Sequence, residues 1–497
     1  MKPLTVVTPY IPGPLFEKTL LSLTKSDLVE CVIILSEKPV YFEMGRCRVL
    51  VAAPLQSHET LSLILAGIRT KYLLLLLGSQ QISIEPKALE RILGVAESPK
   101  TGLVYSDFYD GSEHGKTLHP LNDYQPGSVR DDFDFGAMIL FSVSAVRKTL
   151  KKYRVVPGIK FAGLYDLRLK ISIDHSIYHL QEPLYCVMKT DESSGIEKIF
   201  TYVDPGNRNF QKEMEIVFTD YLKKIGAYLP PYHLREVEQS PATFPVGASV
   251  VIPVRNRKET IGEAVKSALS QETDFPFNII AVDNHSTDGT TTVLSDLASQ
   301  YVKLKHVVPK KTDHGDLGIG GCWNEALRHE ACGRFVIQLD SDDLYSSSRT
   351  LQKMVNMLRQ GNYAMVIGSY TLVNLRLEEI PPGLINHREW TDENGHNNAL
   401  RINGLGAPRA FNTRLMRNIG FLNVSYGEDY AAALRICREY RIGRIYESLY
   451  LCRRWSGNTD AALSIEEANR NDAFKDKIRT AEIFARQRLA ESIAHRA

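Results

Sequence analysis

Short apolar runs rich in aliphatic residues alternate with amphipathic segments along most of the chain. The apolar runs predict strands at residues 4–7, 31–35, 72–77, 102–105, 249–252, 278–282, 335–339 and 365–367. Helical periodicity between them predicts helices that include residues 259–270, 290–300 and 350–360. Strands that are apolar on both faces and alternate with helices are typical of parallel-dominated α/β sheets. The order occurs twice, which predicts two domains of similar layout.

Collinear short matches support this internal repeat. They pair Thr8-Pro9 with Ile252-Pro253, Phe135-Gly136-Ala137 with Leu405-Gly406-Ala407, Tyr165-Asp166 with Glu428-Asp429, and Tyr185-Cys186 with Tyr450-Leu451-Cys452. Each copy is followed by an Asn-Arg-Asn sequence that opens a helical pattern, at 207–209 and at 469–471. Matches in one order over about 200 residues are a far stronger sign than any one of them.

The predicted fold class is therefore α/β, with two tandem Rossmann-like domains that each contain a parallel-dominated mixed sheet and continue into a helical tail. The predicted boundaries are a first domain at 1–192, a helical tail and proline-containing linker at 193–245, a second domain at 246–460 and a C-terminal helix at 461–497. In that last helix a stripe with helical spacing is expected to dock on the protein, and it comprises Phe474, Ile478, Ala481, Ala485 and Leu489.

The two copies differ at the turn that follows one buried strand. The second copy has Asp340-Ser341-Asp342-Asp343, whereas the first has Gly78-Ser79-Gln80-Gln81. Three carboxylates at a strand end provide the oxygen ligands that hard divalent cations prefer, and a glycine with two amides does not. The sequence thus predicts a Mn²⁺ or Mg²⁺ site at Asp340, Asp342 and Asp343, and a first domain without one. Taken alone, such a turn is more often a solvated loop.

Other polar motifs of the second copy also follow strands, where open α/β sheets bind their ligands. These motifs are Pro253-Val254-Arg255-Asn256, the segment from Asp283 to Gly289, and a glycine-rich stretch from Gly318 to Asn324 that is expected near phosphates. Glu428 and Asp429 open a helix, a position that favours a carboxylate and suits a proton acceptor.

Two further segments supply candidate groups for phosphate and sugar. Arg453 and Arg454 provide guanidinium donors for phosphate oxygens, with a solvated surface pair as the alternative, and Trp455 provides an aromatic face, with a core position as the alternative. The polar segment 385–398, which contains His387 and Trp390, is expected to line the acceptor side.

This set of motifs resembles the family 2 glycosyltransferases of the GT-A fold. The matching residues are Pro253, Asn256, Val282-Asp283, Ser286-Thr287-Asp288-Gly289, Asn324, the Asp340 to Asp343 turn and Glu428-Asp429. The resemblance covers about 245–460 by motif and 1–190 by layout only. It implies that Asp283 contacts the nucleotide base, Asp340 the ribose or metal, and Asp342 the metal. It also implies that Asp429 deprotonates an acceptor hydroxyl, with inversion at the sugar carbon.

The resemblance predicts a metal-dependent inverting hexosyl- or N-acetylhexosaminyltransferase of bacterial-type polysaccharide or glycan synthesis. Its donor would be a UDP- or GDP-linked sugar and its acceptor a glycan or glycolipid. The first domain would be a degenerate copy, and a homo-oligomer is compatible with this. Many enzymes of this fold take a metal ligand from a late histidine, but the sole histidine after residue 429 is His495.

Three alternatives remain open at this level. A polymerase with two active sites would need a nucleotide-sugar site in the first domain as well. A sugar nucleotidyltransferase would be expected to have a glycine-rich loop after the first strand, and Pro253 to Lys258 contains no glycine. A non-catalytic carbohydrate-binding scaffold fits the first domain better than the second.

Composition narrows the classes further. The 497 residues carry Lys+Arg 60 against Asp+Glu 58, a balance of +2, so no nucleic-acid footprint is indicated. The 7 cysteines form no CxxC pair and are expected as free thiols in the cytoplasm. No apolar run has the length of a transmembrane span or a signal peptide, so we expect a soluble protein, with peripheral membrane association as the minority alternative.

Overall fold

The fold was analysed in a computed structural model that describes residues 1–77, 82–112, 115–188, 208–238, 243–311, 316–388, 391–402, 404–458 and 463–494. The chain separates into two compact units. Met1–Ile199, Asn207–Tyr228 and Leu463–Ala497 form unit 1, and Leu229–Ala462 forms most of unit 2. Because the C-terminal segment groups with unit 1, this division differs from the predicted order of two domains that each carry their own tail.

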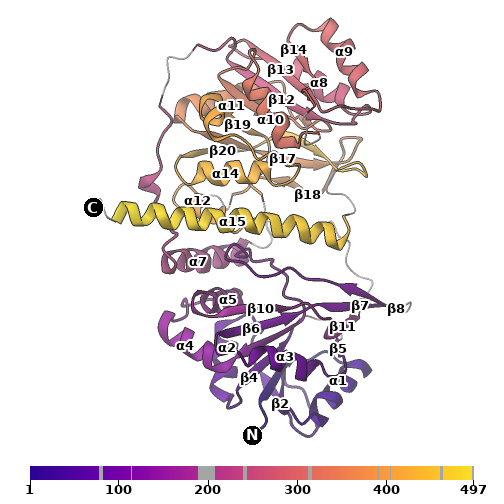
Figure 1. The fold of residues 1–497 in the computed structure, drawn as a ribbon, viewed down its shortest axis with the longest axis vertical. Coiled ribbons are helices and arrows are strands. Elements are labelled where there is room, and N and C mark those ends of the chain that lie inside the picture. The colour runs from indigo at the N-terminus through magenta and orange to yellow at the C-terminus, as the bar shows by residue number, and fades with distance from the viewer. Residues whose placement is uncertain are drawn as a thin grey trace. The chain divides into compact units, whose positions relative to one another are not determined.

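Unit 1 contains a seven-stranded sheet of order β10-β6-β9-β4-β1-β2-β3 (Figure 1). Its strands are β1 (Leu4–Pro9), β2 (Val29–Ser36), β3 (Cys47–Val51), β4 (Tyr72–Leu76), β6 (Thr101–Ser106), β9 (Met138–Ser142) and β10 (Ser176–Leu180). A second sheet of order β5-β11-β7-β8 comprises β5 (Ile82–Ile84), β7 (Phe108–Ser112), β8 (Gly115–His119) and β11 (Tyr185–Met188). The helices are α1 (Pro14–Lys25), α2 (His58–Gly67), α3 (Ala88–Ala96), α4 (Val143–Tyr153), α5 (Gly163–Asp174), α7 (Arg208–Lys224) and α15 (Ile465–Ala494).

Unit 2 contains one larger sheet of order β14-β13-β12-β15-β19-β17-β20-β16, with β18 paired to β17. Its strands are β12 (Ala248–Val254), β13 (Phe277–Asp283), β14 (Leu304–Val307), β15 (Phe335–Gln338), β16 (Leu344–Tyr345), β17 (Met365–Val373), β18 (Glu379–Ile385), β19 (Arg409–Asn412) and β20 (Ile442–Arg453). The helices are α8 (Ile261–Leu269), α9 (Thr290–Gln300), α10 (Ile319–Arg328), α11 (Thr350–Gly361), α12 (Gly395–Asn398), α13 (Thr413–Ile419) and α14 (Glu428–Cys437).

The central strands of both sheets have the same order and the same directions. In unit 1, β3, β2, β1 and β4 run parallel, β9 is antiparallel to β4 and β6, and β10 is parallel to β6. In unit 2, β14, β13, β12 and β15 run parallel, β19 is antiparallel to β15 and β17, and β20 is parallel to β17. The mixed, parallel-dominated α/β fold predicted from the sequence is therefore present in each unit.

The strand interiors explain why these segments were recognisable. All five residues of β4 and all seven of β13 are buried, as expected for strands covered on both faces. The predicted helix at 290–300 coincides with α9, and the predicted helices at 259–270 and 350–360 differ from α8 and α11 by two residues or fewer at each end. Within the described ranges, no helix has the length and hydropathy needed to cross a membrane.

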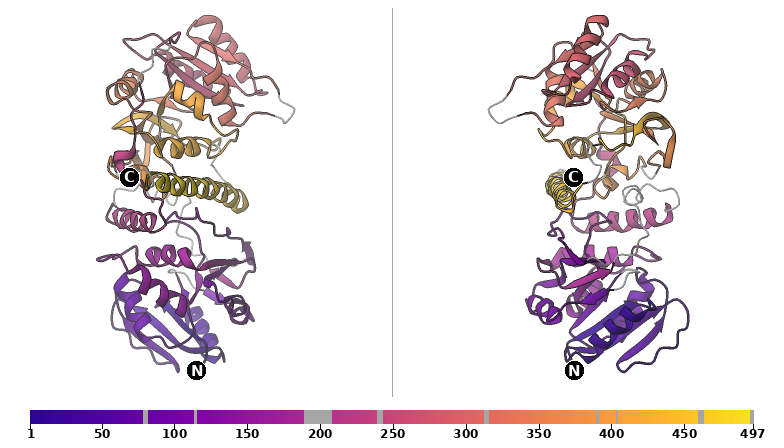
Figure 2. Two further views of the ribbon diagram at one scale, coloured as in Figure 1. Left: turned by 60° about the vertical axis from the view of Figure 1, so that its left-hand side comes forward. Right: turned by 90° about the vertical axis from the view of Figure 1, so that its right-hand side faces the viewer.

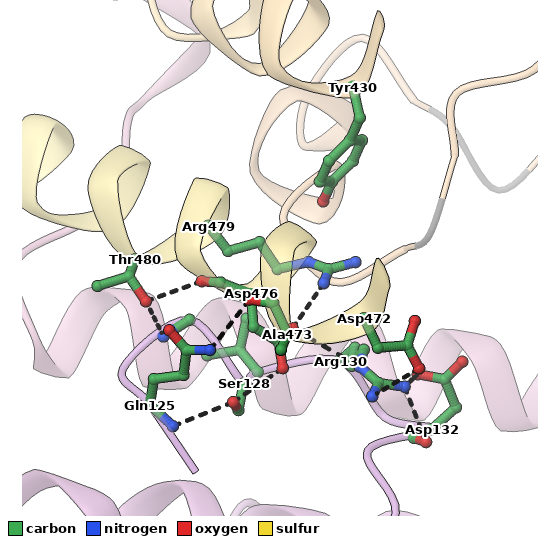
Figure 3. A network of polar contacts seen from close by, with 12 residues as sticks. Gln125, Ser128, Arg130, Asp132, Tyr430, Asp472, Ala473, Asp476, Arg479 and Thr480 are labelled. Atoms are coloured by element: carbon green, nitrogen blue, oxygen red, sulfur yellow. Dashed lines mark hydrogen bonds and ion pairs between the residues drawn. The ribbon is translucent and has the colours of Figure 1, made fainter. Parts of the chain in front are cut away.

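The C-terminal segment forms one long helix, α15 (Figures 1 and 2), which packs in unit 1 through charged and polar groups. Gln125, Ser128 and Arg130 face the first half of the helix, as Figure 3 shows. Gln125 Nε2 donates to the Ala473 carbonyl at 3.1 Å, Ser128 Oγ donates to Asp476 Oδ2 at 2.9 Å, and Arg130 lies 3.0 Å from Asp472. Farther along, Gln487 donates to the carbonyl of Ile225, just after α7.

The predicted apolar stripe is not the buried face of α15. Ala481 is exposed, and the buried side chains are Asp476, Arg479, Glu482, Ile483 and Arg486. Asp476 pairs with Arg479 at 2.7 Å and Glu482 with Arg486 at 2.9 Å, spacings of three and four residues that bring side chains together on one helix face. Phe474, Ile478, Ala485 and Leu489 of the stripe are half-buried, so apolar periodicity misplaced the most buried face, which consists mainly of paired charges.

Candidate functional site

The sequence-predicted motifs of unit 2 meet around one cavity of about 590 Å³. It is bordered by the ends of β12 and β15, by β19, and by the first turns of α10 and α14. The predicted residues that line it are Pro253, Arg255, Asn256, Asp340, Asp342, Asp343, Glu428, Asp429 and Arg454. Residues as far apart in sequence as Pro253 and Arg454 thus share one pocket, at the sheet edge where open α/β folds bind ligands.

The acidic turn is held in place by hydrogen bonds from β20 and the residues after it. The backbone N–H of Arg453 donates to Asp343 Oδ1 at 2.8 Å, and the N–H of Asp340 donates to the Tyr450 hydroxyl at 2.8 Å. Asp342 Oδ2 accepts from Trp455 Nε1 at 3.2 Å and from Asn458 Nδ2 at 3.3 Å. The turn is therefore fixed by contacts that only the folded sheet provides.

Burial and crowding in the acidic turn change the proton affinity of Asp340 and Asp343. Burial raises the pKa of Asp340, and the nearby charge of Asp342 raises it further. Burial also raises the pKa of Asp343 well above its ordinary value, and Asp340 and Asp342 add to the effect. Such a cluster favours anything that brings positive charge into the pocket, since uncompensated buried carboxylates are costly.

The predicted three-carboxylate metal site is not formed as such. Among the described residues, no group of three or more His, Cys, Asp or Glu side chains is arranged to bind one ion. Asp343 is turned toward the backbone of Arg453, which explains why it does not contribute. What fits a divalent ion is Asp340 and Asp342, because Mg²⁺ in phosphate-binding enzymes is commonly held by one or two carboxylates together with phosphates of the substrate.

Glu428 and Asp429 occupy the first turn of α14, after Gly427 in a left-handed conformation with φ of 79°. Asp429 Oδ1 accepts from the N–H of Tyr430 at 2.6 Å, and Asp429 Oδ2 lies 2.5 Å from a guanidinium nitrogen of Arg409. Glu428 is 8% exposed, and its Oε2 has no hydrogen-bond partner among the residues that the structure describes. Burial and the adjacent Asp429 raise the pKa of Glu428 to about 8. At neutral pH, then, Glu428 is mainly a neutral acid beside the proposed base.

Asp283 does not line the pocket, contrary to its predicted contact with a nucleotide base. Its fully buried carboxylate accepts from the Ser286 N–H at 3.0 Å and from the Thr291 hydroxyl at 2.5 Å. Burial opposes its charge, yet the hydrogen bonds from Ser286 and Thr291 keep the pKa of Asp283 below its ordinary value. Asn284, the next residue, does line the pocket, and its Oδ1 is buried without a hydrogen-bond partner.

Asn324 is also structural and not a donor-binding residue. Its side chain donates to the carbonyl of Phe421 at 2.8 Å and accepts from the Phe421 N–H at 2.9 Å. The nearby glycines likewise serve packing: a Cβ on Gly320 would lie 1.8 Å from the Leu422 carbonyl oxygen, and one on Gly318 would lie 2.4 Å from the Val424 carbonyl carbon. The glycines of this stretch therefore allow a close contact between α10 and 422–424, while Ile319, Cys322 and Trp323 from the same stretch line the pocket.

The acceptor-side predictions fare unevenly. His387 is 2% exposed and does not line the cavity, so it cannot face an acceptor there. Trp390 lies outside the described residues. Trp455 binds Asp342 through its ring N–H, and Arg453 is buried behind the acidic turn, where its guanidinium contacts Glu263 and the Asp342 carbonyl. Arg453 supports the turn, whereas Arg454 is the arginine of this pair that reaches the pocket.

Several pocket residues were not predicted from the sequence. They are Arg257, Gln338, Arg409, Phe411 and Phe421. Arg409 Nε donates to Gln338 Oε1 at 3.0 Å, and Gln338 Nε2 donates to both Asp340 carboxylate oxygens at 3.0 Å. A polar residue in the otherwise apolar strand β15 was the one available signal for Gln338.

Comparisons with known proteins identify what unit 2 is similar to. Residues 249–419 match the family model "Glycosyl transferase family 2". The chain is 26% identical over 197 residues to the UDP-Glc:alpha-D-GlcNAc-diphosphoundecaprenol beta-1,3-glucosyltransferase WfgD of Escherichia coli, covering 40% of this chain and 72% of that protein. It is 31% identical over 125 residues to the putative glycosyltransferase EpsE of Bacillus subtilis, covering 25% of this chain and 43% of that protein.

Among solved structures, TarS 1–349 of S. aureus in complex with UDP-GlcNAc is similar at 23% identity and a TM-score of 0.36, covering 48% of this chain and 72% of that one. The mannosyltransferase PcManGT from Pyrobaculum calidifontis, in complex with GDP-Man and Mn²⁺, is similar at 18% identity and a TM-score of 0.32, covering 60% and 87%. The similarity to family 2 glycosyltransferases therefore lies within unit 2, at residues 249–419.

Proposed function

We propose that unit 2 transfers a sugar from a nucleoside-diphosphate donor to a hydroxyl of a glycan or glycolipid acceptor. The observation that carries the proposal is the single pocket shared by Asn256, Asn284, the acidic turn and Asp429. A polar segment for the nucleoside, carboxylates and arginines for a diphosphate, and a carboxylate for a proton are the parts that such a transfer needs.

The proposed reaction is a single displacement with inversion. The acceptor oxygen forms a bond to the anomeric carbon while the bond from that carbon to the diphosphate oxygen breaks. Asp429 accepts the acceptor's proton, and the nucleoside diphosphate leaves with the electron pair of the broken bond. Arg255 and Arg454 are in the pocket to balance the charge that develops on the diphosphate.

The proposal includes a divalent ion, Mn²⁺ or Mg²⁺, at Asp340 and Asp342. Bound there, it would supply positive charge beside the diphosphate. Asp343, with its carboxylate on the Arg453 N–H, would hold the turn instead of binding the ion.

We further propose that unit 1 is a copy of the same fold without catalytic activity, as the predicted tandem arrangement requires. The matching strand order of both units supports this. Asp166, which corresponds to Asp429 in the sequence repeat, is 1% exposed and lies 3.0 Å from His58 Nε2 and 2.5 Å from Lys170 Nζ. A substrate hydroxyl cannot reach a carboxylate buried in that way, whereas the Asp429 side chain is 32% exposed and lines the pocket. Gly78, Gln80 and Gln81, the counterparts of the acidic residues, lie outside the described residues.

Titration calorimetry of the full chain with UDP and GDP, each with Mn²⁺, Mg²⁺ or EDTA, tests these points. We expect one nucleotide site per chain, metal-dependent affinity, and loss of that site in Asp342→Asn. Nucleotide-sugar turnover that is indifferent to EDTA would remove the metal from the mechanism. A second site that survives Asp342→Asn would favour the alternative of two active sites. No binding of either nucleotide, together with no turnover of UDP- or GDP-sugars, would refute the proposed donor class.

A further inference from the structure

A continuous chain of contacts joins the acidic turn to the proposed base across the sheet. Asp340 accepts two hydrogen bonds from Gln338, Gln338 accepts one from Arg409, and Arg409 forms an ion pair with Asp429. Gln338 lies at the end of β15 and Arg409 at the start of β19, which are neighbouring antiparallel strands. The two carboxylates at its ends are those assigned here to the donor side and to proton transfer.

The orientation of the Gln338 amide is determined by both of its neighbours. Its NH₂ group has to face the Asp340 carboxylate, which only accepts, and its oxygen has to face Arg409, which only donates. Gln338 is 6% exposed, and its backbone carbonyl accepts from the Tyr345 hydroxyl at 2.9 Å, so the residue is fixed at both ends. A buried amide whose two ends are both paired holds its two partners at a fixed distance from each other, because any displacement would leave polar groups unpaired.

Arg409 contacts the carboxylate oxygen of Asp429 that has no hydrogen bond to the backbone of α14. Asp429 Oδ1 is held by the N–H of Tyr430 and Oδ2 by Arg409, so both oxygens are oriented. The side chain of Arg409 is only 12% exposed. The charges of Asp429, Asp340 and Glu428 together outweigh the effect of burial and raise the pKa of Arg409, so it remains a cation among these acids.

We propose that Arg409 is a positioning residue for Asp429 and that Gln338 couples it to Asp340. This inference rests on the proposed function of the pocket. In it, Arg409 fixes the orientation of the Asp429 carboxylate, and the Gln338 link sets the position of Arg409 relative to the turn that receives the donor. Lysine would keep the charge but lose the planar fork through which Arg409 reaches Gln338 and Asp429 together.

The test measures kcat, donor KM and acceptor KM for Arg409→Gln, Arg409→Lys, Gln338→Leu and the Arg409→Lys/Gln338→Leu double variant. A small misplacement of a catalytic group costs on the order of 10²-fold in rate, so we expect about that loss in kcat for Arg409→Gln, with donor KM within about 3-fold. Arg409→Lys and Gln338→Leu should each lose about 10-fold, and the double variant should be no worse than about 10-fold, because both break the same link.

The matched control is Arg441→Gln, which removes an arginine from a more exposed ion pair with Glu236 in the same unit and should leave kcat unchanged. Each variant is compared with the wild type by thermal unfolding and by nucleotide-diphosphate affinity. Should Arg409→Gln fail to fold, Arg409→Lys and Gln338→Leu provide the test. A kcat within about 3-fold of the wild type in folded Arg409→Gln or Arg409→Lys would overturn the proposal, as would losses that multiply in the double variant. A wild-type chain without nucleotide binding or turnover would instead refute the proposed function on which it rests.

Discussion

At the scale of single residues, the two copies of the motif provide a matched pair of aspartates. Asp429→Asn should retain nucleotide binding and lower kcat by about 10²–10⁴-fold, because general-base assistance is removed while the pocket keeps its shape. Asp166→Asn should leave kcat unchanged and lower the free energy of unfolding by on the order of 3 kcal/mol, because it breaks a buried pair with Lys170. Steady-state kinetics and denaturant unfolding of both variants check this. Equal kinetic effects of the two substitutions would contradict the assignment of the base.

Glu428 gives a prediction on pH at the same scale. Its pKa of about 8 in the folded protein exceeds the ordinary 4.5, so the folded state holds more protons than the unfolded state between these pH values. Stability from this group is therefore present below pH 4.5 and is lost as pH rises through about 8. Glu428→Gln should match the wild type in Tm near pH 4.5 and exceed it increasingly up to pH 8, as measured by calorimetry. A constant difference across that range would refute the pKa assignment.

The site residues that could be predicted from the sequence are those that stand next to other candidate residues in the chain. The Asp340 to Asp343 turn and the Glu428-Asp429 pair were recognisable because several acidic residues stand together, after a predicted strand or at the start of a predicted helix. Gln338 and Arg409 do not, because each is a single polar residue in its stretch of sequence, and their polar contact forms only in the folded chain. Asp283, Asn324 and His387 failed for the opposite reason: polar residues near a site were assigned to ligand, and the fold uses them to satisfy its own buried groups.

At the scale of elements, we predict that the contact between α10 and residues 422–424 is needed both for the stability of the protein and for nucleotide binding. A Cβ on Gly320 would clash with the backbone oxygen of Leu422, and α10 supplies Ile319 and Cys322 to the pocket. Gly320→Ala should therefore destabilise the protein by about 1–3 kcal/mol and weaken nucleotide binding. Gly262→Ala in α8 is the control, since its nearest atom is 3.8 Å away and alanine is the better helix former. Thermal unfolding with and without nucleotide separates them, and an unperturbed Gly320→Ala would contradict the packing account.

The elements themselves were largely predictable because their signals are local. A strand buried on both faces is a continuous apolar run, and β4, β12 and β13 all read as such. The antiparallel strand β19 was recognised only as a match between copies, since four residues carry little periodicity. The buried face of α15 escaped because its charged pairs look like a solvated surface until their partners are known.

At the scale of the whole molecule, the chain forms unit 1, then unit 2, and returns to unit 1 with α15. Unit 1 therefore depends on residues that follow the catalytic domain in sequence, and a fragment that stops near residue 240 lacks them. Arg130 shows what is lost: its guanidinium is 3.0 Å from Asp472 and 3.6 Å from Asp476, both on α15. The structure gives Arg130 a third ion pair, with Asp132 of unit 1 itself. Of these three ion pairs, removal of the helix would leave only the one with Asp132.

Gly127 is the position at which this return can be tested in the full chain. Its N–H donates to Thr480 Oγ1 at 2.8 Å, and a Cβ there would lie 2.0 Å from the Asp476 carbonyl oxygen and 2.4 Å from the Thr480 nitrogen. Because both are backbone atoms of α15, Gly127→Ala should displace the helix and lower the free energy of unfolding by about 1–3 kcal/mol. Gly94→Ala in α3, with nothing within 4 Å, should be neutral or stabilising. Hydrogen exchange of α15 and of the segment around Ser128 provides the measurement. We expect faster exchange in both segments for Gly127→Ala alone, and protection equal to the wild type would show that α15 is not held by this contact.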